Sequence, residues 1–206
     1  FRPDYRRIRT LVAELGADVP VLATTATAND RVVDDVAAQL GVGAADRTDL
    51  SGAADRPDLS GGADTLVLRG GLDRESLRLS VVQISSAAQR VAWIAGHLNS
   101  LQGSGIIYTL TVAGARDLAA LLRDMGHHVA AYTGATDPAE REQLESDLLA
   151  NRVKALVATS ALGMGFDKPD LGFVIHLGAP SSPISYYQQV GRAGRAVDHA
   201  LVVLLW

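Results

Sequence analysis

Short apolar, β-branched runs alternate with helical patterns along nearly the whole chain, and this alternation constrains the fold more than any other feature. Several of the runs are continuously apolar, as is typical of strands covered on both faces of a parallel sheet. The alternation predicts an α/β fold with right-handed crossovers between parallel strands. The candidate strands are residues 19–24, 65–69, 77–84, 105–109, 128–132, 153–158, 172–177 and 200–205.

The helices between these strands have recognisable ends. In residues 88–101 and 112–125, apolar side chains recur at the spacing of one buried helix face. Gly126 follows the second pattern as a C-terminal stop signal. Asp137 followed by Pro138 predicts a further helix start, with an N-cap and a proline in the first turn.

The composition excludes some classes of protein. A chain of 206 residues that is 48% hydrophobic can bury a core, and the absence of cysteine excludes disulfides and thiolate metal sites. Apolar runs are too short to cross a bilayer, so we expect no membrane association and a cytoplasmic protein. Phe1 is not a natural start, so we expect missing upstream sequence. The net charge of −4 does not indicate nucleic-acid binding, which must therefore rest on motifs.

One stretch interrupts the α/β pattern. Residues 43–51 read GAADRTDLS and residues 52–60 read GAADRPDLS. The nine-residue period is similar to calcium-binding β-roll repeats, but two copies without a glycine-rich pattern cannot stack into a stable coil. We therefore predict that residues 43–62 are a flexible, polar, duplicated insert without chemistry of its own.

The segment SYYQQVGRAGR, residues 185–195, carries the most informative chemistry. It follows a proline-led helical start, which predicts that it lies on one helix and the following turn. Arg192 and Arg195 are three positions apart and would share a face. Two guanidiniums beside glycines suit a triphosphate, whose charge they can neutralise. The spacing alone is equally compatible with a solvated basic helix end.

A second segment, VATSALGMGFDKP at residues 157–169, follows the end of a candidate buried strand. Thr159 and Ser160 supply hydroxyls, Gly165 is one of two glycines that permit a tight loop, and Asp167 supplies a carboxylate. The loop beyond the carboxyl end of a parallel strand is where α/β sheets bind ligands. Hydroxyls and backbone amides suit phosphate oxygens, whereas a carboxylate suits ribose hydroxyls or a cation.

Together the two segments resemble motifs V and VI of superfamily-2 helicases, and GMGFDKP with QQVGRAGR resembles RecQ helicases in particular. Three upstream stretches extend the resemblance. FRPDY at residues 1–5 resembles the end of the RecQ aromatic-rich loop, LATTATA at 22–28 resembles motif III, and SGIIY at 104–108 resembles motif IV. Five motif regions thus stand in the family's order across nearly the whole chain.

The resemblance implies roles at matching positions. Arg195 matches the arginine finger, which reaches the γ-phosphate held by the other lobe. Arg192 and Gln188 match its partners at the nucleotide, and Gly165 and Asp167 match the ATP-binding part of motif V. The positions implied to contact DNA, or to couple hydrolysis to DNA contacts, are Phe1, Arg2, Thr25, Thr27, Thr159 and Ser160.

The resemblance also implies a RecA-like architecture. Residues 1–75 would be the C-terminal part of lobe 1 with the insert, and residues 76–206 a nearly complete lobe 2. The implied activity is ATP-dependent translocation on single-stranded DNA and unwinding of duplex DNA with 3′–5′ polarity, using ATP and Mg²⁺. The family's phosphate loop and DEAH box would lie upstream of Phe1, so we expect this chain alone to be inactive; no zinc site is expected in it.

Two departures and two alternatives remain. Leu110-Thr111-Val112 stands where the family has Asn-Ser-Arg, and Ala196 replaces an aspartate, which indicates a divergent RecQ-like branch. A DEAD-box RNA helicase would share the architecture, but it opens motif VI with a histidine–arginine pair where this chain has Gln188-Gln189. A non-unwinding nucleic-acid clamp or annealing module need not keep both motif VI arginines.

Overall fold

The computed structural model describes residues 74–162 and 166–206 together with shorter upstream pieces, namely residues 7, 10, 11, 14, 19, 21–24, 32, 36, 46–49 and 66–69. The chain divides into two units, Phe1–Asp73 and Arg74–Trp206. In the described part of the chain, no helix combines the length and apolar character needed to cross a membrane.

The first unit contains a two-stranded parallel sheet, formed by β1 (Asp46–Asp49) and β2 (Leu66–Arg69). β2 was predicted. β1 lies inside the first copy of the repeat, where no strand was predicted. The physical reason is that ladder hydrogen bonds join backbone groups, and a polar segment can therefore be ordered by a neighbouring strand.

The strand predicted at residues 19–24 is not present at its described positions. Residues 21–24 are exposed and have no regular secondary structure. An apolar, β-branched run becomes a strand only where a neighbouring strand accepts its backbone hydrogen bonds. The described residues of this unit provide no such neighbour for residues 21–24.

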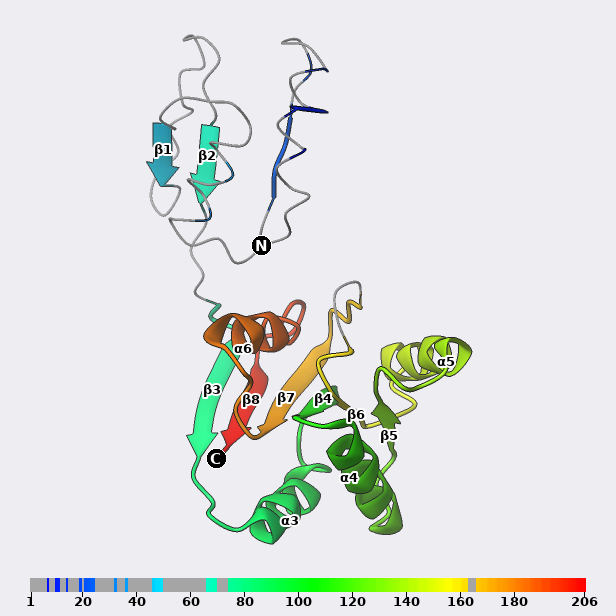
Figure 1. Cartoon of the computed structure of the whole chain (residues 1–206). Helices are drawn as coiled ribbons and strands as arrows, with labels where there is room; N and C mark the ends of the chain where they lie inside the picture. The colour runs from blue at the N-terminus through cyan, green and yellow to red at the C-terminus, as the bar shows by residue number, and fades with distance from the viewer. Residues whose placement is uncertain are drawn as a thin grey trace. The chain divides into compact units, whose positions relative to one another are not determined.

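The second unit is built on one six-stranded sheet in the order β3-β8-β7-β4-β6-β5, with every neighbouring pair parallel. The arrowheads of β3, β7 and β8 accordingly point the same way in Figure 1. Each strand coincides with a predicted one, which confirms the α/β class. The strands are β3 (Leu77–Val82), β4 (Ser104–Thr109), β5 (Val129–Tyr132), β6 (Ala155–Ala158), β7 (Leu171–Leu177) and β8 (Ala200–Leu205).

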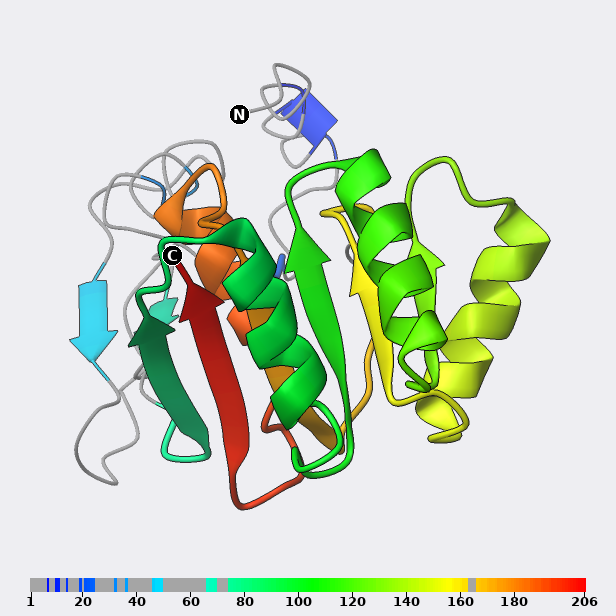
Figure 2. The same cartoon turned by 90° about the horizontal axis from the view of Figure 1, so that it is seen from below.

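Helices cover both faces of this sheet. Side chains of α3 (Ala87–His97) and α4 (Val112–Asp124) pack with inward-facing strand residues in one core cluster. Side chains of α5 (Pro138–Leu149) and α6 (Pro183–Val190) pack in a second cluster on the opposite face. Figure 2 shows α3 and α4 on the near face of the sheet.

Local capping explains where these helices begin. Asp137 Oδ1 accepts a hydrogen bond from Ala139 N at 2.9 Å, and Pro138 opens α5, as predicted. Ser182 Oγ accepts from Ser185 N at 3.1 Å at the start of α6. Each cap satisfies a backbone N–H that has no partner inside the helix.

Candidate functional site

The segment between β6 and β7 runs from the carboxyl ends of the strands, here called the carboxyl edge, to their amino ends, the amino edge. Both strands pair in parallel with β4, so the carboxyl end of β6 and the amino end of β7 lie at opposite edges. Thr159 directly follows β6 at the carboxyl edge, whereas Asp167 lies four positions before Leu171, which begins β7. The expectation that Thr159 and Asp167 share a loop beyond the carboxyl ends is therefore wrong.

At the carboxyl edge, Thr159 organises the turn that follows β6. Thr159 Oγ1 accepts a hydrogen bond from Ala161 N at 3.3 Å, and Thr159 O accepts from Leu162 N at 3.3 Å. Thr159 is buried, whereas Ser160 is exposed. Ser160 is therefore the more accessible hydroxyl of the two at this edge.

At the amino edge, both motif VI arginines reach the segment before β7. Arg192 Nη1 donates to Phe166 O at 2.9 Å, and Arg195 Nη1 lies 2.8 Å from Asp167 Oδ1. The side chains of Arg195 and Asp167 are 45% and 56% exposed. The Arg195 guanidinium and the Asp167 carboxylate are thus accessible, and the partly buried Arg192 reaches the neighbouring residue Phe166.

The spacing predicted that the two arginines share a helix face, but neither lies on a helix. α6 ends at Val190, and the chain continues through turns. Gly194 has a φ of +69°, a left-handed conformation that stops helical continuation. A Cβ at Gly194 would lie only 2.8 Å from Ser76 Oγ, so this position requires glycine for a second reason.

Two residues near the start of the unit hold this loop, and motif-based prediction missed both. Arg74 donates from Nη1 to Gly191 O at 2.9 Å and from Nη2 to Gly194 O at 2.8 Å. Ser76 Oγ donates to Gly194 O at 2.6 Å. The Arg74 contacts join residues 117 and 120 positions apart, and no local pattern in the sequence indicates them.

A buried polar cluster lies beneath α6. His176 Nε2 is 2.8 Å from Gln189 Oε1, an acceptor, so Nε2 carries the proton of a neutral ring. The ring of His176 stacks on Tyr108 with centroids 5.3 Å apart. Burial lowers the pKa of His176, although the hydrogen bond to Gln189 opposes this effect. Burial raises the pKa of Tyr108 to about 12, and the nearby charge of Arg192 opposes the rise.

This cluster distinguishes the two adjacent glutamines of motif VI, Gln188 and Gln189. Gln188, the predicted nucleotide contact, is exposed, whereas its neighbour Gln189 is the residue that bonds to the core. Within the described part of the chain, Tyr108 Oη and Arg192 Nε are buried without a hydrogen-bond partner. Arg192 therefore stands between the Tyr108 side chain, whose pKa its charge lowers against the effect of burial, and the Phe166 carbonyl, to which its Nη1 donates.

Five of the predicted site residues lie outside the residues that the structure describes, namely Phe1, Arg2, Thr25, Thr27 and Gly165. Across the residues that are described, no three His, Asp or Glu side chains are grouped so as to hold a metal ion.

A parallel sheet covered by helices on both faces, with two motif VI arginines at its amino edge, defines a RecA-like helicase lobe. The family of helicase conserved C-terminal domains matches residues 89–197, and the chain belongs to that family.

The similar curated proteins are RecQ-family helicases. The chain is 34% identical to the ATP-dependent DNA helicase RecQ of Synechocystis over 97% of its own length. It is 30% identical to the probable ATP-dependent DNA helicase RecS of Bacillus subtilis over its whole length. It spans 38% and 37% of the length of these two relatives. The resemblance to RecQ helicases found in the motifs is thereby confirmed.

A solved structure supports the same class. The helicase Lhr of Mycobacterium smegmatis, bound to single-stranded DNA and AMP-PNP, superimposes with a TM-score of 0.60 at 26% identity. The match covers 69% of this chain and 21% of that one.

Proposed function

We propose that this chain is part of the motor of a RecQ-like helicase that couples ATP hydrolysis to translocation on single-stranded DNA and to duplex unwinding. The observation that carries the proposal is the convergence of Arg192 and Arg195 on Phe166 and Asp167 at one accessible edge of the sheet. An arginine that is fully buried and bonded only within the protein could not reach a bound nucleotide. The names of the RecQ and RecS relatives and the ligands of the Lhr structure agree with it.

In this proposal, Arg195 is the arginine finger, and Gln188, Arg192, Gly165 and Asp167 contact the nucleotide. The Arg195 side chain is 45% exposed, so a triphosphate can replace or share its contact with Asp167. A guanidinium presents a planar fork of donors that matches phosphate oxygens. Phosphoryl transfer depends mainly on such positioning and charge stabilisation.

The proposed ATP and Mg²⁺ need further groups. The described residues hold no cluster that could bind a metal ion, and no segment of the sequence matches the family's phosphate loop or DEAH box. The chain spans only 38% and 37% of the length of its two relatives, and we propose that the Mg²⁺ ligands and the triphosphate cradle of the full-length protein come from residues outside this chain. Arg195 would then complete the site only when the two lobes close, which links hydrolysis to motion.

DNA contacts are proposed at the other edge of the sheet. Ser160 is exposed there, and Thr159 holds the turn that presents it. Thr25 and Thr27 are proposed to couple hydrolysis to DNA contacts, and Phe1 and Arg2 to sense DNA. With nucleotide and strand at opposite edges, closure of the lobes would shift the grip on a strand that is held mainly by its phosphates.

The proposed domain assignment places the end of lobe 1 at residues 1–75 and lobe 2 at residues 76–206. It is supported by the division of the chain after Asp73 and by the family match at 89–197. A cytoplasmic location is proposed on the same family grounds.

The test uses the full-length protein. ATP turnover should be measured alone, with single-stranded DNA and with single-stranded RNA, together with unwinding of duplexes that carry a 3′ or a 5′ tail. DNA-stimulated turnover with unwinding of the 3′-tailed duplex is expected. Stimulation by RNA alone would favour the DEAD-box alternative, and strand binding without turnover would favour a clamp. The isolated 206-residue chain is expected to show no turnover.

A further inference from the structure

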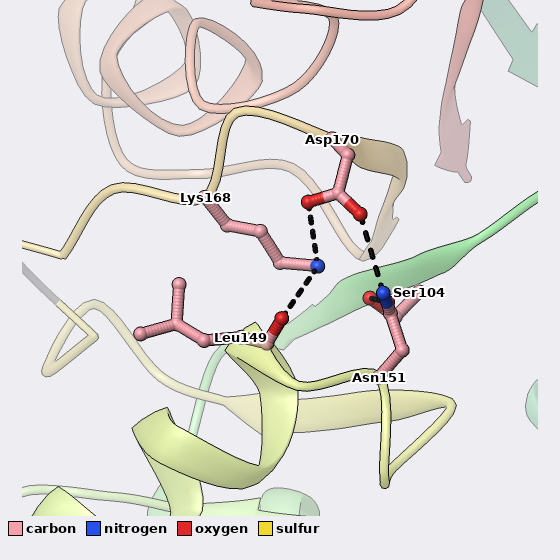
Figure 3. Close-up of polar contacts among 5 residues, drawn as sticks. All are labelled: Ser104, Leu149, Asn151, Lys168 and Asp170. Carbon is pink, nitrogen blue, oxygen red and sulfur yellow. Dashed lines mark hydrogen bonds and ion pairs between the residues drawn. The ribbon is translucent and has the colours of Figure 1, made fainter.

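A buried lysine stands directly after Asp167, and neither motif chemistry nor packing explains it. Lys168 is 1% exposed, and its Nζ donates to Asp170 Oδ1 at 2.7 Å and to Leu149 O at 3.4 Å. Figure 3 shows the ammonium between these two acceptors. Only the cation of this pair is buried, because the Asp170 side chain is 51% exposed. Burying an ammonium carries a desolvation cost, so the contacts of Lys168 point to a need for defined geometry.

The lysine belongs to a chain of hydrogen bonds that reaches the sheet. Asn151 Nδ2 donates to Asp170 Oδ2 at 3.2 Å, and Ser104 Oγ donates to Asn151 Oδ1 at 2.8 Å (Figure 3). Leu149 ends α5 and Ser104 begins β4. Asn151 has a φ of +57°, the one positive φ outside glycine among the described residues. The network thus joins α5 and β4 to the 168–171 turn, which is closed by Leu171 N donating to Lys168 O at 3.2 Å.

The same turn receives the loop that carries Arg195. Gly194 N donates to Leu171 O at 3.1 Å, and Ala196 N donates to the carbonyl of Pro169 at 2.8 Å. These two donors are the immediate neighbours of Arg195 on either side. Asp167, the partner of Arg195, directly precedes the turn. Both members of the Arg195–Asp167 pair are therefore attached to the 168–171 turn.

We infer that Lys168 and Asp170 are positioning residues for Arg195, acting through the 168–171 turn without contacting the nucleotide. The Lys168 ammonium holds the turn against α5, and the turn sets where the backbone on both sides of Arg195 lies. This inference rests on the proposed role of Arg195. Placement matters because a displacement of about 1 Å at a distance from the chemistry can cost up to about 10²-fold in rate.

The first test is kinetic and uses the full-length protein. Lys168→Met keeps the volume of the side chain and removes its charge. We expect DNA-stimulated kcat to fall roughly tenfold to a hundredfold, with the KM for ATP within about twofold of wild type because Lys168 has no contact with the nucleotide. Asn151→Gly is a second variant, because glycine adopts the positive φ without strain while breaking the link to Asp170. It should lower kcat in the same direction.

A double-variant cycle separates positioning from general damage. If Lys168 acts through Arg195, Lys168→Met should have almost no further effect on kcat in an Arg195→Ala background. A further loss of the full size seen in wild type would overturn the inference. Arg152→Ala is the matched control, since it breaks the ion pair between Asp147 of the same helix and Arg152, whose side chain is 54% exposed. It should leave kcat unchanged in both backgrounds.

A readout independent of catalysis keeps the inference distinct from the proposed function. Amide hydrogen exchange at Gly194 and Ala196 should be faster in Lys168→Met than in wild type, and unchanged in Arg152→Ala. Unchanged exchange at both amides would overturn the inference even if the protein is an active helicase. If exchange is faster in Lys168→Met than in wild type but the wild-type protein shows no ATP turnover, the proposed function is refuted and the positioning of Arg195 stays intact.

Discussion

Arg195 Nη1 lies 2.8 Å from Asp167 Oδ1, in an ion pair whose two side chains are each about half exposed. Exposed pairs of this kind contribute little to stability, because water screens the charges and the side chains lose rotamer freedom. The Arg195–Asp167 pair is therefore better explained by keeping the Arg195 guanidinium in place at the surface than by the stability it adds. A variant at Arg195 can consequently report on function without unfolding the protein.

Arg195→Ala should lower ATP hydrolysis in the full-length protein by about three orders of magnitude, the scale on which arginine fingers act. Unwinding should fall with it, while single-strand binding stays near wild type. Arg195→Lys should rescue poorly, because a lysine cannot reproduce the planar fork of the guanidinium. Turnover assays and strand-binding titrations check this. Loss of DNA binding with surviving hydrolysis would make Arg195 a contact to the DNA backbone instead.

The Lys168–Asp170 pair predicts an asymmetry in stability. Asp170→Ala leaves the Lys168 ammonium buried without its carboxylate, so the free energy of unfolding should fall by about 3 kcal/mol. Lys168→Met should cost clearly less, because the Asp170 side chain is 51% exposed and remains hydrated. Chemical denaturation measures both. Asp147→Ala is the control, because it leaves behind Arg152, a cation that is 54% exposed and stays hydrated, and it should change stability by about 1 kcal/mol or less. Equal losses of unfolding free energy in Asp170→Ala and Lys168→Met would contradict the burial of Lys168 beside an exposed Asp170.

His176 predicts a pH dependence of stability. Burial holds the pKa of the folded-state imidazole below its ordinary value of about 6.5, so the unfolded chain binds more protons between these two pKa values. Stability should therefore decrease as pH falls below about 6.5 and through the folded pKa. His176→Gln, which cannot be protonated, should flatten this part of the profile. Thermal melts across pH 7 to 5, run on wild type and His176→Gln side by side, test it.

The duplicated insert gives a prediction about tolerance. Deleting residues 52–60 retains the first copy, which contains β1, and shortens the connection to its parallel partner β2 within the first unit. The six-stranded sheet of the second unit is untouched, so its melting temperature should stay within about two degrees of wild type, by calorimetry with and without calcium. A loss of several degrees, or a gain that depends on calcium, would show that the second copy contributes structure of its own.

Motifs and periodicity predicted much of this protein, and the failures are specific. The strand at Ala200–Leu205 and the start of α5 at Pro138 were predicted at the positions found, because apolar periodicity and capping are local properties of the chain. Residues 19–24 have a strand-like composition without a described partner strand, and β1 has a polar composition with one. In both cases pairing with another segment, not composition, decided the outcome.

The sequence by itself determined the order of strands and helices in the second unit, the family, and the identity of the two arginines. Only the tertiary structure decided that Thr159 and Asp167 lie at opposite edges of the sheet. It also decided that the loop carrying Arg195 is held by Arg74, Ser76 and the 168–171 turn. The reason is physical: local propensities act within a few residues, whereas the hydrogen bond from Arg74 to Gly194 joins positions 120 residues apart and exists only after β3, β7 and β8 have assembled.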